Sequence, residues 1–227
     1  MNKLKITLLS LVASAFLTVT SFAGVTVGIS AALAGLEASG TETLKDSSTV
    51  VSHTEQANAV IPSIFLEVAH ASGLGVGVDF VSGTADLSGS TQQTTMTDLG
   101  NGGGEGNDSG TNSANAEVDG IVTGYLIKSF DSGLFVKLGM ASADVNTKET
   151  LATGTKYGNT SLDGIHYGVG FQRTNDSGLF IRAAAEYTDF DNITLTGSQA
   201  GGTTTSFNKI SADVDVAMAK FSVGKAF

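Results

Sequence analysis

The feature that most restricts the fold is a repeated strand–turn–strand pattern. Three segments, 67–80, 126–140 and 171–187, each place Ser-Gly after Ala or Asp and then resume an alternation of apolar with small or polar residues. A Ser-Gly step is typical of a tight hairpin turn, in which glycine adopts a positive φ at little cost. Alternation with a period of two predicts strands with one apolar and one polar face. The pattern therefore predicts antiparallel hairpins.

Two further segments, 24–34 and 217–227, alternate in the same way and raise the expected number of strands to eight. The apolar residues just upstream of the second segment fall on the opposite parity, and a β-bulge near 217–219 would reconcile them. These upstream residues are Val214, Val216 and Met218. Four long links rich in Gly, Ser, Thr and Asn alternate with the tight turns. They span residues 35–57, 85–114, 144–160 and 191–208.

The polar face of the expected strands carries charges of both signs. Lys137 and Arg182 occupy the same position relative to their turns, with Glu67 at nearly the same height. Opposite charges among glycines fit the interior of a narrow barrel, because buried charges must be paired. The residues expected to form this lumen charge network are Glu67, Asp79, Asp119, Lys137, Arg182 and Glu186. They would either stabilise the barrel as a satisfied network or exchange partners as a gate for small ions.

The opposite face is mostly aliphatic, as contact with lipid would favour. Short turns at one end and long links at the other are expected of outer-membrane barrels. We therefore predict an all-β fold, an eight-stranded antiparallel up-and-down transmembrane β-barrel with its apolar face outward.

The N-terminus predicts export. Two lysines precede an apolar run, residues 6–19, and Ser21 and Ala23 supply small residues at the −3 and −1 positions of a cleavage site. This order is that of a secretory signal peptide, and the run is too short to span a bilayer as a helix. We expect residues 1–23 to be cleaved and residues 24–227 to form a barrel domain in the outer membrane of a Gram-negative cell.

Composition excludes several classes of function. Without residues 1–23 the chain keeps 10 Lys and Arg against 22 Asp and Glu, a net charge of −12, which argues against nucleic acid as a partner. The absence of Cys excludes disulfides and thiolate metal sites. No stretch after Ala23 approaches the roughly 20 apolar residues of a membrane-spanning helix.

The sequence offers no convincing catalytic, cofactor or metal site. His53, His70 and His166 fall at different heights of the predicted barrel, so no Ser, His and acid can be grouped on one rim. We therefore expect a protein that is not an enzyme and has no cofactor, with His166 as a hydrogen-bonded interior residue. One G-G-x-G-x-D match at 103–108 lies in the second long link, where a flexible acidic loop is favoured over a weak cation site.

The C-terminal pattern, Phe227 with Phe221 and Val223 in phase behind it, resembles the signal by which bacteria assemble outer-membrane proteins; Lys225 departs from that signal. Segment 163–171 and the Ser-Gly-Leu-Phe hairpins are similar to the outer-membrane barrel group that contains the OmpA transmembrane domain, OmpX and the opacity proteins. The resemblance implies the fold, the outer membrane, and its lipid and barrel-assembly machinery as partners. It transfers little function, because members of one fold differ mainly in their loops.

Three hypotheses of function stay open. In the first, the barrel anchors a structural and surface-interaction protein whose four long extracellular loops contact an unidentified ligand. In the second, the charged interior is a narrow, porin-like channel for small ions or solutes, although eight strands leave an interior about wide enough for side chains. In the third, the apolar face turns inward and a soluble periplasmic calyx binds an apolar ligand. The terminal Phe pattern and the asymmetry of the links argue against the third.

Overall fold

The computed structural model describes residues 10, 24–43, 50–86, 93–96, 110–150, 156–198 and 209–227, most of which are in β-strands. No helix in this part of the chain has the length and apolar character needed to cross a bilayer. The predicted signal peptide, residues 1–23, lies outside the described residues apart from Ser10.

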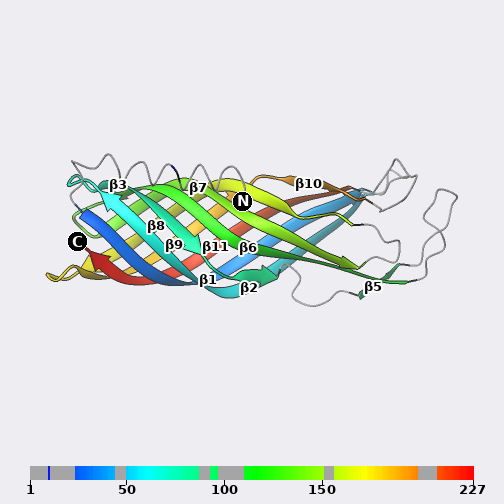
Figure 1. Ribbon diagram of the computed structural model, residues 1–227, viewed down its shortest axis with the longest axis horizontal. Coiled ribbons are helices and arrows are strands. Elements are labelled where there is room, and N and C mark those ends of the chain that lie inside the picture. The colour runs from blue at the N-terminus through cyan, green and yellow to red at the C-terminus, as the bar shows by residue number, and fades with distance from the viewer. Residues whose placement is uncertain are drawn as a thin grey trace.

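Eight strands form the wall of a closed antiparallel barrel (Figure 1). They are β1 (Gly24–Thr43), β2 (Val50–Ala69), β3 (Leu74–Val81), β6 (Gly110–Ser129), β7 (Leu134–Thr150), β8 (Thr160–Thr174), β9 (Leu179–Phe190) and β11 (Lys209–Ala226). Each pairs with the next in this order, and β1 closes the barrel by pairing with β11 from Thr26↔Ala226 to Thr43↔Lys209. The predicted eight-stranded antiparallel up-and-down barrel is confirmed.

Three short strands extend the wall. β4 (Thr84–Asp86) and β5 (Gln93–Met96) pair with β6 beyond the end of β3, and β10 (Ile193–Thr196) pairs with β11 beyond the end of β9. The strands therefore continue far into the segments predicted as links. β1 and β2, for example, pair as far as Thr43↔Val50, so the link expected over 35–57 is much shorter. Its Thr, Ser and Gly residues suggested a loop, but β1 is hydrogen-bonded to β11 on one side and to β2 on the other, and this pairing holds the segment in a strand.

The three tight turns form as predicted and lie at one end of the barrel, which we call the turn end. In each turn the amide of a glycine donates to the carbonyl three residues earlier, as from Gly73 to His70 at 2.8 Å and from Gly178 to Asn175 at 2.9 Å. The glycines adopt positive φ, 79° at Gly73, 91° at Gly133 and 84° at Gly178, which a residue with a Cβ atom rarely accepts. The opposite end is called the loop end.

The bulge predicted near 217–219 is wrong. β11 keeps an unbroken register with β1 along its length, so Val214, Val216 and Met218 point into the barrel and Phe221 and Val223 point out. The upstream residues are apolar because the interior itself is apolar at that height. The wall does contain a register shift in β6, between Asp119 and Val122.

The outside of the barrel carries a band of exposed large apolar side chains, which we call the apolar belt. It includes Val27, Ile29, Leu33, Val60, Ile64, Phe80, Leu126, Val136, Leu138, Ile165, Val169, Ile181, Phe221 and Val223. The interior is filled by side chains of alternating inward residues. It has a charged part toward the turn end and an apolar part toward the loop end, and these two parts are the basis of the candidate site.

Candidate functional site

Glu67 of β2 is held from three sides inside the barrel. Arg182 of β9 donates from Nη1 to Oε1 and from Nη2 to Oε2, each at 2.7 Å, which is a bidentate ion pair. The hydroxyl of Tyr125 donates to Oε1 at 2.8 Å, and Lys137 Nζ lies 4.0 Å from the same oxygen. Gln172 accepts from Arg182 Nε at 2.9 Å, which fixes the plane of the guanidinium group.

A second set of ion pairs adjoins the first. Glu186 of β9 receives Lys137 Nζ at 3.0 Å and Lys220 Nζ at 2.7 Å. Lys220 of β11 also donates to Asp79 Oδ2 at 2.6 Å, so it joins carboxylates from two strands. His166 Nδ1 lies 3.0 Å from the hydroxyl of Thr188, as expected of a hydrogen-bonded interior residue.

The interior charge network thus consists of three carboxylates and three cations, and their side chains are at most 5% exposed. Its members are Glu67, Asp79, Glu186, Lys137, Arg182 and Lys220. Equal numbers of opposite charges leave no net charge to be buried. Removing one member leaves a buried charge without compensation, which is strongly destabilising.

The structure brings five of the six predicted lumen residues together and leaves Asp119 out. The shift in β6 adds one residue to the strand, with Gly120 at a φ of 59°, and reverses the alternation beyond it. Val118 and Ile121 consequently face inward, and Asp119 lies on the outside opposite Asp144. The interior position expected for Asp119 is therefore not found.

Lys220 is the network member that the sequence analysis missed. It immediately precedes Phe221, which was placed on the lipid-facing side, so simple alternation would have placed Lys220 inside. The bulge predicted at 217–219 left the orientation of the adjacent Lys220 unassigned. Lys220 forms an ion pair with Asp79 and another with Glu186, so the network predicted without it lacked one of the three cations.

Four inward aromatic rings each lie over a glycine directly opposite on the neighbouring strand. The pairs are Phe65 with Gly28, Tyr125 with Gly77, Phe135 with Gly170 and Phe180 with Gly224. A Cβ atom at any of these glycines would meet the ring, so the ring occupies the place of the absent side chain. Aromatic covering of strand glycines is a known device for fixing register.

The rings also contact the cations of the network. The guanidinium of Arg182 lies 4.7 Å from the centroid of Phe135 and 4.8 Å from that of Phe65. Lys137 Nζ lies 4.3 Å from the centroid of Tyr125. Such cation–π contacts are stronger when desolvated. The network is therefore enclosed by aromatic side chains toward the turn end.

Toward the loop end the interior is closed by an apolar layer. It comprises Ala32, Ala34, Leu36, Ile61, Val81, Val118, Ile121, Ala141, Ala143, Val145, Leu162, Phe190, Val214, Val216 and Met218. None of these side chains is more than 6% exposed. Between the apolar layer and the charges, Ser63 Oγ and Asp79 Oδ1 are buried without a hydrogen-bond partner.

The predicted loop site and the remaining histidines do not contribute to a second candidate site among the described residues. The G-G-x-G-x-D match at 103–108 lies outside the described residues, and so does the side chain of His53. His70 is at the turn end, where its Nδ1 accepts from the Ser72 amide at 3.1 Å. Within the described residues no group of three His, Asp or Glu side chains is arranged to hold a metal ion.

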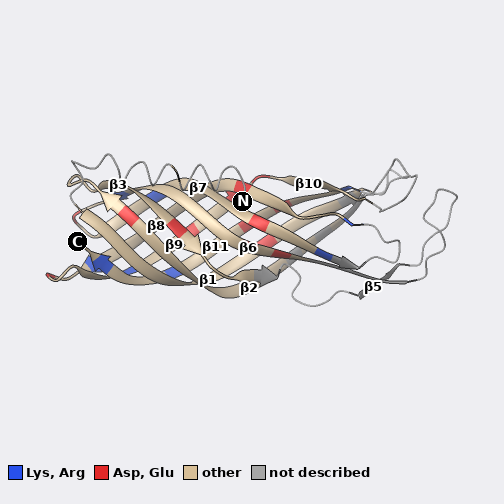
Figure 2. Cartoon of the chain, viewed as in Figure 1, with Lys and Arg blue, Asp and Glu red and all other residues tan. Residues whose placement is uncertain are grey.

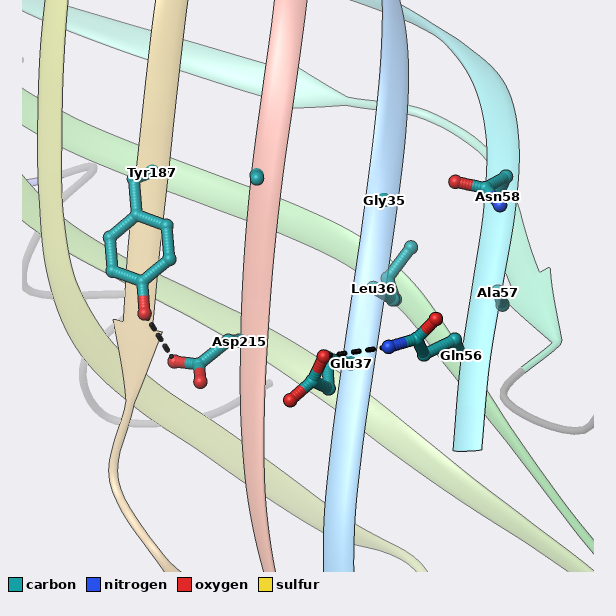
Figure 3. Close-up of a pocket in the computed structure, with 9 residues that line it drawn as sticks. Gly35, Leu36, Glu37, Gln56, Ala57, Asn58, Tyr187 and Asp215 are labelled. Atoms are coloured by element: carbon teal, nitrogen blue, oxygen red, sulfur yellow. Dashed lines mark hydrogen bonds between the residues drawn. The ribbon is translucent and has the colours of Figure 1, made fainter. Parts of the chain in front are cut away.

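A shallow hollow of about 380 Å³ lies on the outside, where the apolar belt ends (Figure 3). It is lined by Gly35, Leu36, Glu37, Gln56, Ala57, Asn58, Tyr187, Asp215 and Ala217. The Tyr187 hydroxyl donates to Asp215 Oδ1 at 2.9 Å, and Gln56 Nε2 donates to Glu37 Oε2 at 2.9 Å. These contacts place polar groups of four strands at one level of the outer wall.

The whole chain is similar to several solved structures of outer-membrane proteins. The chain is similar to the outer membrane protease OmpT from Escherichia coli, with a TM-score of 0.51 and 9% identity over 91% of this chain and 98% of that one. It is also similar to Ail, the attachment invasion locus protein of Yersinia pestis (TM-score 0.46, 12% identity, 92% and 100% covered). OprG from Pseudomonas aeruginosa is a third such protein (TM-score 0.47, 12% identity, 89% and 97% covered).

No protein-family model and no curated protein matches the chain. Membership of the group of OmpA, OmpX and the opacity proteins therefore stays a prediction. The likeness to OmpT shows the barrel fold alone, so the activity of this chain has to be argued from its own residues.

Proposed function

We propose that the chain is an outer-membrane barrel that anchors a surface-interaction site at its loop end. The observation that carries the proposal is an apolar exterior around an interior that buried side chains fill. A soluble barrel would bury its apolar face, whereas here Ile29 is 60% exposed and Leu138 54% exposed while charged side chains are buried. This inside-out arrangement supports contact with lipid and argues against the calyx.

The height of the apolar belt fits a bilayer. On β1 the outward residues are apolar from Val25 to Leu33, nine residues, and a tilted barrel strand needs about 9–11 to cross. At the loop end of the belt an outward carboxylate follows on six of the eight wall strands. These residues, the acidic row, are Glu37, Asp119, Asp144, Asp163, Asp189 and Asp215.

The wall continues past the acidic row. β6 and β7 remain paired as far as Ser113↔Thr150, and β1 and β2 as far as Thr43↔Val50. This extension carries the loops beyond the membrane on paired strands. An acidic projection built on paired strands is suited to contact with an external ligand, and we propose that the loops at its tip determine which ligand that is.

The last strand supports assembly in the outer membrane. Phe221, Val223 and Phe227 are outward and exposed, so they are available to the barrel-assembly machinery that we propose as a partner. The proposal assigns no reaction to the chain. Of the two histidines with described side chains, His70 is at the turn end and His166 is inside the barrel, where Thr188 and Glu186 surround it.

A narrow channel is the second candidate. The buried unpartnered atoms Ser63 Oγ and Asp79 Oδ1 favour it, because they form a polar spot that water could occupy. The apolar layer argues against it, since ions would have to cross a region without polar partners. We therefore place the channel second.

The test is fractionation with heat-modifiable gel mobility, followed by conductance in planar bilayers. Recovery in the outer membrane, a boiling-dependent shift and silent bilayers are the results expected for an anchor. A reproducible small conductance that changes in Lys137→Gln or Arg182→Gln would favour the channel. A soluble periplasmic protein without a shift would contradict both.

A further inference from the structure

Three basic side chains lie on the outside of the barrel at its turn end. Lys128 of β6, Arg173 of β8 and Lys225 of β11 have an outward register and are exposed or half-buried. Figure 2 shows basic positions in blue near the end of the barrel at which the C-terminus lies. Lys128 also donates to the backbone carbonyl of Ser72 in the neighbouring turn. Among the described residues, no carboxylate forms an ion pair with any of these three cations.

Each of these cations is surrounded on the outer wall by apolar side chains. Its cross-strand neighbours are Leu74 and Val136 for Lys128, Ile181 for Arg173, and Val27 and Leu179 for Lys225. A phenylalanine two positions away in the chain lies beside each charged group. The distances to ring centroids are 5.6 Å for Lys128 and Phe130, 5.1 Å for Arg173 and Phe171, and 5.3 Å for Lys225 and Phe227.

The cations and the acidic row bound the apolar belt from opposite ends. On β11, Lys225 and Asp215 are ten residues apart, and on β8 Arg173 and Asp163 have the same separation. Ten residues at about 3.3 Å each, tilted by about 40°, span roughly 25 Å, the height of the apolar band of a membrane barrel. In a bilayer centred on the apolar belt, the three cations would lie at the level where the headgroups of one leaflet begin.

We propose that Lys128, Arg173 and Lys225 bind the phosphate groups of anionic phospholipids in the leaflet at the turn end. This inference rests on the proposed membrane location. Long basic side chains at the edge of an apolar surface extend toward polar headgroups. Because none of the described carboxylates forms an ion pair with them, the counter-ion at that level is a lipid phosphate, and the adjacent phenylalanine rings pack against the first methylenes of the acyl chains.

The experiment measures which lipids contact the barrel. The protein, expressed from its full coding sequence and purified from the membrane fraction, is reconstituted in phosphatidylcholine at low ionic strength. Electron spin resonance then compares the immobilised fractions of spin-labelled phosphatidylglycerol and phosphatidylcholine. We expect a preference for phosphatidylglycerol of about twofold or more, since one basic residue at an anionic surface contributes up to roughly fivefold in binding. The variant K128Q/R173Q/K225Q should show almost equal fractions.

The matched control removes the same number of charges from the loop end. In K148Q/K156Q/K209Q the altered residues are exposed and lie beyond the acidic row, so the preference should persist. An equal loss in this control would show that net charge alone sets the preference and would overturn the proposal. Equal fractions of the two lipids in the wild type would overturn it as well.

Heat-modifiable mobility is measured on every sample to separate the two proposals. A protein that folds and inserts without lipid preference contradicts only the headgroup site. A protein that stays soluble contradicts the membrane location as well. Should the triple variant fail to assemble, the single variants Arg173→Gln and Lys225→Gln each have to lower the preference, and no change in either contradicts the site.

Discussion

Arg182 and Glu67 form a bidentate ion pair across the barrel although 115 residues separate them in the chain. Their strands, β9 and β2, are not neighbours in the sheet but are separated by β11 and β1, so the pair joins two parts of the wall through the interior. Glu67 also contacts Tyr125 and Lys137, and Arg182 also donates to Gln172. The pair is therefore a central contact of the charge network.

We predict that Arg182→Ala lowers the free energy of unfolding by about 3–5 kcal/mol, because it leaves Glu67 buried without its principal cation. The measurement is urea unfolding in lipid vesicles followed by the mobility shift on unboiled gels. The matched control is Lys148→Ala, which removes an exposed ion pair with Glu117 and should cost at most about 1 kcal/mol. Equal effects of the two substitutions would contradict the role given to the network.

Because aromatic rings cover the inward glycines, a Gly→Ala substitution should lower the free energy of unfolding at an inward glycine and leave it nearly unchanged at an outward one. Gly28→Ala forces a Cβ atom against the ring of Phe65 and should destabilise the barrel by about 1–3 kcal/mol. Gly35→Ala lies on the same strand but faces outward, where the nearest atom to an added Cβ is Asn58 Oδ1 at 3.4 Å. The same urea titration should show little change at Gly35, and the double variant G28A/F65L should recover part of the loss at Gly28.

The apolar layer predicts different costs for two leucines of β1. Leu36 is 3% exposed inside the barrel, whereas Leu33 is 59% exposed on the belt. Leu36→Ala leaves a cavity and should cost about 2–5 kcal/mol. Lipid chains can fill the space left by Leu33→Ala, so its cost should be smaller when both are measured in vesicles. A larger loss at Leu33 would argue that the interior is not packed as described.

The continuous register of β11 can be tested directly, because the chain has no native cysteine. Single cysteines at positions 214 to 223 are labelled with a fluorophore after unfolding, and the refolded proteins are exposed to brominated lipid. Quenching should alternate without interruption, strong at Ala217 and Phe221 and weak at Val216 and Lys220. A reversal of phase between 217 and 219 would restore the bulge that the sequence favoured.

Alternation together with the Ser-Gly steps was sufficient to predict the eight wall strands, their antiparallel order and the tight turns. It also placed Lys137, Arg182 and Glu67 on one face, because charges at matched heights beside similar turns come together when the strands are aligned. These features depend on local chemistry, namely side-chain parity and glycine at positive φ. For that reason they can be recognised in a single sequence.

Features that depend on height along the barrel could not be predicted in the same way. Parity assigns a residue to the inside but does not say whether the inside is charged or apolar at that level, so Val216 and Met218 were explained by a bulge that does not exist. The register shift that does occur, between Asp119 and Val122, was not signalled by the alternation of apolar and polar residues. It places Asp119 on the outside of the barrel instead of the inside. The ends of the strands were also missed, since Thr and Ser suit both loops and the exposed wall of a barrel.

The apolar layer inside the barrel has a consequence for the cell that makes the protein. Its packed Ala, Val, Leu and Ile side chains offer no hydrogen-bond partner to a polar solute at that height of the barrel. In the membrane location that we propose, each molecule then adds surface without adding permeability. We therefore expect that a cell can hold many copies without increased leakage of small solutes, in agreement with the silent planar bilayers expected of an anchor.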